Sequence, residues 1–256
     1  MKYNGYLIYT DLDATLLDKN ARLSDKNKKA IENFQKNGGL FSYATGRSFD
    51  FTKKFPLKAN APLICVGGTR VYDCKTGEEI FSVPMDKTGK DAVLCAKENY
   101  KNILAAYVFK DDGRTECDIK SAADISDQIF KVVFVFETED EALEFQKDMA
   151  KRFEDSLVFE RSWNTGVEML SKYAGKGACV KKVRDLYKNK IHTIVCAGDF
   201  ENDISMLRAA DTAVAVSNAL SCVKKEADII APAHYEDAIA WIIENIKEIT
   251  GKGDSI

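Results

Sequence analysis

Short apolar runs that alternate with helix-like segments constrain the fold of this chain more than any other feature. Residues 5–10 (GYLIYT) and 62–66 (PLICV) are apolar at nearly every position, and the runs at 192–198 (HTIVCAG) and 212–216 (TAVAV) have the same character. Strands that are apolar on both faces are typical of a parallel sheet covered by helices. The two ends of the chain therefore predict an α/β fold with a doubly wound parallel-sheet core.

The middle of the chain follows a different pattern. Strand-like runs at 103–109, 131–137, 157–160 and 166–170 tend to follow one another instead of alternating strictly with helices. Strands in succession favour an antiparallel α+β unit inserted into the core. The expected domains are a first core part at 1–83, an α+β insert at 84–170 and a second core part at 171–256.

Composition and charge limit the classes of partner. Lys and Arg number 37 and Asp and Glu number 40, which gives a net charge of −3 and argues against a nucleic-acid partner. No apolar stretch approaches the roughly 18 residues of a membrane span, and the N-terminus turns acidic too early for a signal peptide. The 7 cysteines form no CxxC pair, so we expect reduced thiols and a cytoplasmic location. We also expect a monomer or a homodimer, without a membrane partner.

Polar segments stand at the predicted ends of the core strands, where open α/β sheets bind ligands. The first segment, DLDATLL at 11–17, places Asp11 and Asp13 on one side of an extended backbone. Two neighbouring carboxylates repel each other unless a cation lies between them, and their oxygens suit Mg²⁺. A plain turn, in which Asp is common, explains the same residues equally well.

Two further segments offer groups that could bind an anion. In ATGRS at 44–48, Thr45 and Gly46 open a helix with a hydroxyl and an accessible backbone N–H. Lys176 begins a later helix in AGKGACV and can supply a point charge to a phosphate. Each segment taken alone is better explained as an ordinary helix cap or as a solvent-exposed lysine.

The segment GDFENDISML at 198–207 carries three polar side chains, Asp199, Asn202 and Asp203. They stand at a strand end and in the first turn of a helix, positions that can direct all three to a common point. A helix cap alone needs fewer polar groups, which favours a functional site over a capped turn.

The order DxDxT, TGR, GK and GDxxND resembles the haloacid dehalogenase (HAD) superfamily. The tail GDFENDISMLRAADTAVAVSNALSCVKKEADIIAP is similar to the Cof-type subgroup (type IIB), in which a cap domain lies between the second and third motifs. The resemblance covers both ends of the chain by motif and the middle by architecture alone. It implies a Rossmann-like HAD core with a cap, and a magnesium-dependent phosphatase whose substrate is a small phosphorylated metabolite, most often a sugar phosphate.

The resemblance also implies a role for each motif residue. Asp11 would attack phosphorus and form an aspartyl phosphate, while Asp13 would protonate the leaving group and then activate water. The expected ligands of Mg²⁺ are Asp11, the backbone carbonyl of Asp13 and Asp199. The expected phosphate-binding groups are the backbone N–H groups of Leu12 and Gly46 and the side chains of Thr45, Lys176 and Asn202. Asp203 would orient Lys176 or a metal-bound water, and Arg47 would bind phosphate or an acidic group, or tie its helix to the sheet.

The sequence departs from the family pattern at three places. Ala14 replaces the Gly of DxDGT, a change that a small Cβ should allow. Gly67 stands where relatives often carry Asn, so a positioning amide is lost or supplied elsewhere, and the run at 236–239 (EDAI) replaces the more usual EDGV. No nucleophile, acid or metal position is missing, which predicts an active enzyme.

The insert is expected to close over the core and to recognise the leaving group. Trp163 and Asn164 are candidates to touch a sugar, although the plainer expectation is that Trp163 fills the small core of the cap or the hinge. Hexose phosphates, other sugar phosphates, pyridoxal phosphate and flavin mononucleotide all suit a cap of this size. A phosphomutase that uses Asp11 and Asp13, and a non-catalytic module that binds a phosphorylated metabolite, are the competing hypotheses.

Overall fold

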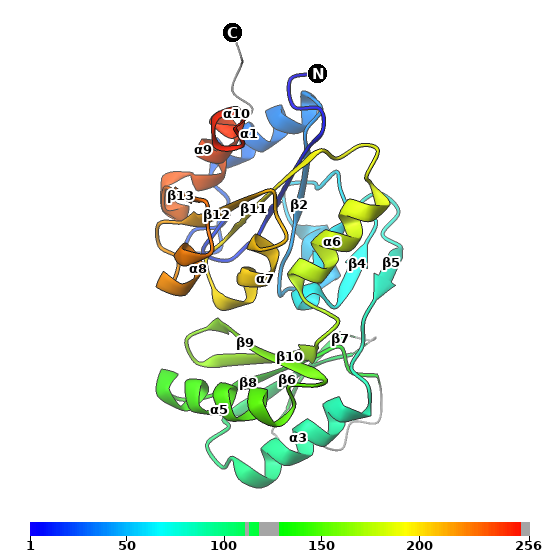
Figure 1. The fold of residues 1–256 in the computed structure, drawn as a ribbon, viewed down its shortest axis with the longest axis vertical. Coiled ribbons are helices and arrows are strands. Elements are labelled where there is room, and N and C mark those ends of the chain that lie inside the picture. The colour runs from blue at the N-terminus through cyan, green and yellow to red at the C-terminus, as the bar shows by residue number, and fades with distance from the viewer. Residues whose placement is uncertain (111–112, 118–127, 252–256) are drawn as a thin grey trace.

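A parallel five-stranded sheet forms the centre of the larger domain in the computed structural model, which describes residues 1–110, 113–117 and 128–251. Its strand order is β13-β12-β11-β1-β2, and every pairing is parallel (Figure 1). The strands are β1 (Tyr6–Thr10), β2 (Leu40–Tyr43), β11 (Thr193–Gly198), β12 (Thr212–Val216) and β13 (Ile229–Ala231). Because β1 lies between β2 and β11, both ends of the chain form one sheet, which confirms the predicted parallel core.

Helices pack around this sheet. They are α1 (Asp25–Lys36), α2 (Phe49–Lys54), α6 (Lys176–Leu186), α7 (Ile204–Leu207), α8 (Ser221–Lys225), α9 (Ala238–Glu244) and α10 (Ile246–Ile249), with short 3₁₀ turns η1 (Val66–Gly68), η2 (Glu201–Asp203) and η3 (His234–Glu236). α1 begins where predicted, because the Ser24 hydroxyl accepts a hydrogen bond from the backbone N–H of Asn27. Ile31 and Phe34 on its inner face are buried, and α1 packs against α9. Within the described ranges, no helix has the length and apolar character needed to cross a bilayer.

A small antiparallel sheet of β3 (Leu63–Cys65), β4 (Arg70–Tyr72) and β5 (Glu79–Ser82) extends the core. The run at 62–66 was predicted as a strand of the parallel sheet, but β3 meets that sheet through a single parallel bridge between Ala44 and Ile64. The chain reverses directly after β3, where Gly67 and Gly68 have φ of 71° and 87°. This reversal pairs β3 with β4 and corrects the prediction.

The inserted unit is a second antiparallel sheet with strand order β7-β6-β8-β10-β9, and we call it the cap. Its strands are β6 (Ala105–Lys110), β7 (Gly113–Cys117), β8 (Lys131–Val135), β9 (Leu157–Trp163) and β10 (Gly166–Ser171), and its helices include α3 (Lys87–Asn99) and α5 (Glu139–Arg152). The sequence did not predict β7, because the polar run GRTEC lacks an apolar alternation. The α+β character of the insert is confirmed, and 84–170 remains its proposed extent.

The two faces of the cap sheet have different partners. One face packs against α3 and α5, which lie on the side turned away from the core (Figure 1). This face contributes Val108, Val132, Phe134, Val167 and Met169 to a separate apolar core. Since side chains alternate along a strand, the opposite face points toward the parallel sheet. That face carries Tyr107, Phe109, Lys131, Val133 and Glu168, and it forms a roof over the strand ends of the core.

Candidate active site

Three of the predicted segments meet at one edge of the parallel sheet. Asp11 follows β1, Thr45 follows β2 shortly after its end, and Asp199 follows β11. Because these strands run parallel and side by side, their carboxyl ends lie at the same edge. The backbone N–H of Asp11 donates to the carbonyl of Ala197 at 2.9 Å, which extends the strand pairing up to the site. All three side chains are buried.

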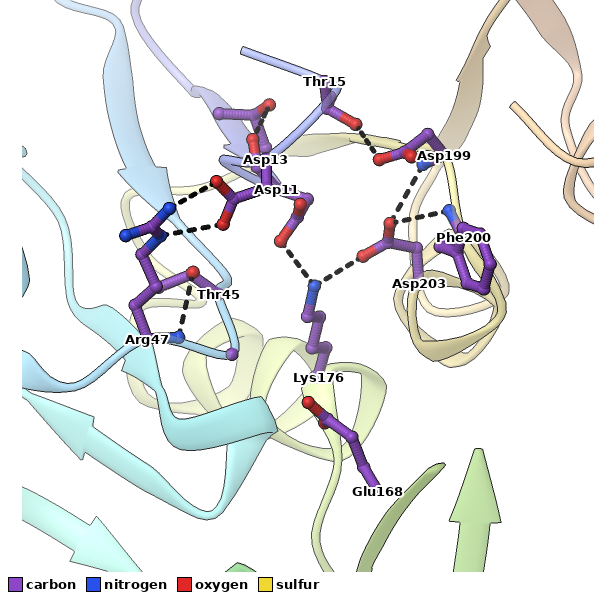
Figure 2. A network of polar contacts seen from close by, with 12 residues as sticks. Asp11, Asp13, Thr15, Thr45, Arg47, Glu168, Lys176, Asp199, Phe200 and Asp203 are labelled. Atoms are coloured by element: carbon purple, nitrogen blue, oxygen red, sulfur yellow. Dashed lines mark hydrogen bonds and ion pairs between the residues drawn. The ribbon is translucent and has the colours of Figure 1, made fainter. Parts of the chain in front are cut away.

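Lys176 joins two of the buried carboxylates from the start of α6. Its Nζ donates to Asp11 Oδ1 at 2.6 Å and to Asp203 Oδ1 at 2.7 Å (Figure 2). The start of α6 lies so close to the η1 turn that a Cβ on Gly68 would come within 2.2 Å of the Gly175 carbonyl carbon. Lys176 is fully buried, so the alternative of a solvent-exposed lysine is wrong.

Both carboxylate oxygens of Asp203 are held by protein donors. Oδ1 accepts from Lys176, and Oδ2 accepts from the backbone N–H groups of Asp199 at 2.9 Å and Phe200 at 3.3 Å. Oxygens of Asp11, Asp199 and Asp203 lie within 4.8 Å of one another. Because the oxygens of Asp203 are already occupied, its geometry suits an orienting role, whereas Asp11 and Asp199 suit direct contact with a cation.

Thr15 is a site residue to which the sequence assigned no role. Its hydroxyl donates to Asp199 Oδ1 at 2.6 Å, across a sequence separation of 184 residues (Figure 2). The bond fixes the orientation of the Asp199 carboxylate relative to Asp11. The Thr of the DxDxT motif was the available signal.

Burial is the largest influence on the pKa values of the Asp11 and Asp199 carboxyl groups. Loss of solvation raises the pKa of Asp11 to about 7, although the Lys176 ammonium opposes the shift. Loss of solvation, with the charges of Asp203 and Asp11, raises the pKa of Asp199 to about 8. For Lys176, burial disfavours the charged form, but Asp11 and Asp203 outweigh it and raise the pKa. Clustered carboxylates with hard oxygen donors fit a divalent cation held by Asp11 and Asp199.

Asp13 points away from this buried group and pairs with Arg47. Arg47 Nε donates to Asp13 Oδ2 at 2.8 Å, and Arg47 Nη2 donates to Asp13 Oδ1 at 2.6 Å (Figure 2). The Arg47 guanidinium also stacks on Phe51, with Cζ 4.0 Å from the ring centroid. The structure shows Arg47 paired with an acidic group of the core, and its contact with a phosphate stays a prediction. The ion pair occupies both carboxylate oxygens of Asp13 in the structure.

A cavity of about 600 Å³ lies between the core and the cap. The predicted site residues that line it are Asp11, Asp13, Gly46, Arg47, Asp199 and Asn202. Four other predicted residues are buried behind this lining: Leu12, Thr45, Lys176 and Asp203. A cavity of this size accommodates a small organic group in addition to a phosphoryl group.

The cap contributes an ion pair that the sequence analysis missed. Lys131 Nζ donates to Glu168 Oε1 at 2.8 Å and to the backbone carbonyl of Gly46 at 3.2 Å. Both charged side chains are almost fully buried, and both line the cavity. The available signal was one charged residue in each of the apolar runs KVVFV and GVEML, because buried charges are rare unless they are paired.

Trp163 lines the cavity with 40% of its surface exposed, so it does not fill the core of the cap, which was one part of the expectation. Its indole packs over Gly166, where a Cβ would come within 2.2 Å of the ring. Trp163 Nε1 donates to Thr165 Oγ1 at 3.2 Å. Asn164 is not among the lining residues, and its backbone carbonyl accepts from Arg161 Nη1 at 3.5 Å.

Ala14 adopts a left-handed backbone conformation with φ of 59°. Since glycine adopts this region without a steric penalty, Ala14→Gly should raise the free energy of unfolding by roughly 1 kcal/mol. Ala30→Gly, inside α1, is the matched control and should lower it by about 0.5–1 kcal/mol. Urea unfolding of both variants and the parent measures the two changes. A loss of stability in Ala14→Gly would contradict the expected strain.

Comparison with known proteins connects this geometry to a family. The family model described as haloacid dehalogenase-like hydrolase matches residues 8–243. The 5-amino-6-(5-phospho-D-ribitylamino)uracil phosphatase YwtE of Bacillus subtilis is 25% identical, over 93% of this chain and 97% of its own. The pyridoxal phosphate phosphatase YbhA of Escherichia coli is 27% identical, over 93% of this chain and 97% of its own. The solved structure of the HAD subclass IIB sugar phosphatase BT4131 is 17% identical, covers 94% of this chain and 98% of its own, and superposes with a TM-score of 0.78.

The residues matched by the family model include every motif segment of the core and the whole cap. The structural likeness confirms the predicted architecture of a parallel-sheet core with an inserted α+β cap. The chain therefore belongs to the haloacid dehalogenase-like hydrolases, as a phosphatase of the Cof type.

Proposed function

We propose that the protein is a Mg²⁺-dependent phosphatase that hydrolyses a small phosphorylated metabolite through an aspartyl phosphate on Asp11. A sugar phosphate is the favoured class of substrate. The observation that carries the proposal is the buried contact of Lys176 with Asp11 and Asp203, directly behind the part of the cavity wall that Asp11 and Asp199 form. Phosphate monoesters hydrolyse extremely slowly without a catalyst, so several fixed charges have to act together.

The proposed reaction has two chemical steps, and Asp11 and Asp13 act in both. In the first step, a carboxylate oxygen of Asp11 forms a bond to phosphorus, and the bond from phosphorus to the alkoxide breaks. Asp13 gives its proton to the departing alkoxide. In the second step, Asp13 takes a proton from water, which attacks phosphorus and releases Asp11 as a carboxylate. Arg47 holds Asp13 in the structure, and the approach of an anionic phosphoryl group would compete for its guanidinium.

The remaining groups position the phosphoryl oxygens. Leu12 and Gly46 would donate from backbone N–H groups, and Thr45, Lys176 and Asn202 would donate from side chains. Mg²⁺, held by Asp11, Asp199 and the backbone carbonyl of Asp13, would supply positive charge to the phosphoryl oxygens. Asp203 and Thr15 keep Lys176 and Asp199 in place.

Two comparisons support a small substrate. One relative is named as a phosphatase of a phosphoribitylamino-uracil and another as a phosphatase of pyridoxal phosphate. Both names describe small organic phosphates, which agree in scale with the cavity beneath the cap. The buried free thiols of Cys65, Cys179 and Cys196 support the proposal of a reducing compartment, the cytoplasm. The proposed protein is a monomer or a homodimer and has no nucleic-acid or membrane partner.

Phosphate release tests the proposal directly. Wild-type protein should release phosphate from some members of a panel of phosphorylated metabolites when Mg²⁺ is present, and should lose that activity in EDTA. A phosphomutase would instead need a bisphosphate activator and would convert one sugar phosphate into its isomer. Binding without turnover, in protein that binds Mg²⁺ and is folded, would favour a non-catalytic module and contradict the proposal.

The affinity for Mg²⁺ should depend on pH. Since the pKa values of Asp11 and Asp199 are raised from 3.8, the metal-free protein is stabilised at low pH and loses that contribution as pH rises through about 7 to 8. Mg²⁺ competes with the protons, so it should raise the melting temperature more at about pH 8 than at about pH 5. Thermal unfolding with Mg²⁺ or EDTA measures the difference. An equal increase at both pH values would show that these carboxylates do not hold the ion.

A further inference from the structure

Glu201 of the core reaches across the domain boundary to the cap. It is the first residue of η2 and lies in the sequence between the motif residues Asp199 and Asn202. Its Oε1 accepts from Arg161 Nη2 at 2.6 Å and from Arg161 Nε at 3.1 Å, and its Oε2 accepts from Gln146 Nε2 at 3.0 Å. Arg161 lies on β9 and Gln146 lies on α5, so two elements of the cap bind one carboxylate of the core.

The edge of the cap sheet provides a further donor to Glu201. β9 is the last strand of this sheet and has β10 on one side alone. An edge strand leaves backbone N–H groups without a strand partner. The backbone N–H of Arg161 donates to Glu201 Oε2 at 3.3 Å, so the core carboxylate takes the place of a strand there. The contact therefore depends on where β9 lies as well as on the charge of its side chain.

Burial distinguishes this contact from an ion pair on the surface. The side chain of Arg161 is 6% exposed and that of Glu201 is 18% exposed. Arg161 Nη1 also donates to Glu139 Oε1 at 2.6 Å, and the guanidinium lies 5.7 Å from the ring centroid of Phe200. Charged groups that share several hydrogen bonds in a buried place keep a defined geometry. We call the contact of Arg161 with Glu201 the latch.

The turn that carries Glu201 is closed by its own hydrogen bonds. Asp203 Oδ2 accepts from the backbone N–H groups of Asp199 and Phe200, which ties the two ends of the turn together (Figure 2). Because a closed turn moves as a unit, a displacement of Glu201 also displaces Asp199 and Asn202. Asn202 lines the cavity, and Asp199 is a proposed ligand of Mg²⁺. The latch thus connects the position of the cap with the position of a metal ligand.

We propose that Arg161 and Glu201 are positioning residues that couple the cap to the metal site, so that Mg²⁺ binding and the latch stabilise each other. The carboxylate oxygens of Asp11, Asp199 and Asp203 lie within 4.8 Å of one another, and their like charges repel. The latch holds the turn from the cap side and so lowers the cost of ordering it around the ion. By reciprocity, Mg²⁺ favours the latch by the same factor. The inference rests on the proposed Mg²⁺ site.

The Mg²⁺ affinity of a cap variant tests the coupling without any substrate. At about pH 8, Arg161→Met should raise the Kd for Mg²⁺ by about fivefold in calorimetry, although Arg161 is not a proposed ligand of the ion. Arg152→Met, which breaks an ion pair with Asp148 inside the cap, is the matched control and should leave the Kd unchanged. An unchanged Kd in folded Arg161→Met would overturn the proposal.

Glu201→Ala separates the coupling from simple electrostatic attraction. Loss of the positive charge of Arg161 would by itself strengthen the attraction for Mg²⁺, whereas loss of the negative charge of Glu201 would weaken it. Coupling through the latch predicts a weaker affinity in both variants. The double variant should match either single variant within about twofold, because both changes remove the same contact. Changes of opposite sign, or effects that add in the double variant, would overturn the proposal.

Hydrogen exchange in β9 measures the reciprocal effect. Opening of the latch frees the backbone N–H of Arg161, so saturating Mg²⁺ should slow its exchange in the wild type by about fivefold. In Glu201→Ala, Mg²⁺ should leave the exchange of the peptide 157–163 unchanged. This comparison decides the outcome if Arg161→Met does not fold. Exchange in the wild type that does not respond to Mg²⁺ would overturn the coupling.

Failure of the coupling and failure of the proposed function give different results. A wild-type protein that binds Mg²⁺ and hydrolyses a phosphate ester, but shows neither effect, retains the phosphatase proposal and overturns the coupling. Both effects in a protein that hydrolyses no phosphate ester would support the coupling and contradict the phosphatase. A wild-type protein that does not bind Mg²⁺ would overturn both.

Discussion

Asp11→Asn should abolish turnover, with a decrease in kcat of at least about 10⁴-fold, because loss of a covalent nucleophile has effects of this size in enzymes whose catalytic groups act together. The amide cannot form the acyl phosphate, although it fills the same space beside Lys176. Phosphate release with saturating Mg²⁺ measures the loss. Asp50→Asn, an exposed change on α2, is the matched control and should retain wild-type activity.

The same variant should not lose stability in the absence of metal. Loss of solvation on burial is the largest cause of the raised pKa of Asp11, and it outweighs the opposing charge of Lys176. A neutral amide removes the cost of burying a charge at about pH 8, which offsets the lost contact with Lys176, and Lys176 keeps its contact with Asp203, so the melting temperature in EDTA should stay close to that of the wild type. A variant that is inactive because it is unfolded would give no evidence about the nucleophile, and residual turnover near the wild-type rate would contradict its role.

Lys176→Met should cause the largest loss of stability among the site variants. Its Nζ contacts Asp11 and Asp203, and all these groups are buried, so the change leaves two carboxylates without their cationic partner. Removing one member of a buried ion pair typically costs about 3–5 kcal/mol. Activity should decrease as well, by about 10²- to 10³-fold, because Lys176 is expected to stabilise the phosphoryl oxygens.

The matched control for Lys176→Met is a lysine on the exposed side of the same helix. Lys181 is exposed on α6, so Lys181→Met should change the free energy of unfolding by less than about 0.5 kcal/mol. The deficit of Lys176→Met should be greater at about pH 8 than at about pH 6, since the stranded carboxylates can take up protons at the lower pH. Urea unfolding at both pH values tests this, and equal stability of the two lysine variants would refute the structural role of Lys176.

The parallel core, and the edge of its sheet at which the motif residues lie, could be predicted because local sequence patterns determine them. β1 and β11 are apolar on both faces, which is sufficient to indicate a covered parallel sheet. In such a sheet the strand ends share one edge, so Asp11 and Asp199 were expected to meet although they are far apart in the sequence. β7 escaped prediction because its residues are polar, and β3 was assigned to the wrong sheet because its pairing depends on the turn that follows it.

The cap side of the site depends on register, which one sequence does not reveal. Lys131 and Glu168 belong to neighbouring strands, and their pairing needs the alignment of β8 with β10. Trp163 lies beside an irregularity in the pairing of β9 with β10, so its direction could not be derived from simple alternation. The contact of Arg47 with Asp13 could not be predicted either, because several acidic or anionic partners were possible and the tertiary structure determines which one Arg47 meets.

The most direct test of the account is the detection of a phosphoryl group on Asp11 during turnover. Wild-type protein mixed with Mg²⁺ and a good substrate should be quenched in acid within a single turnover, digested and examined by mass spectrometry. The account predicts a phosphorylated peptide that contains Asp11 and that is absent from Asp11→Asn and from samples in EDTA. Phosphate release without any such adduct, or an adduct on a different residue, would contradict the aspartyl-phosphate mechanism.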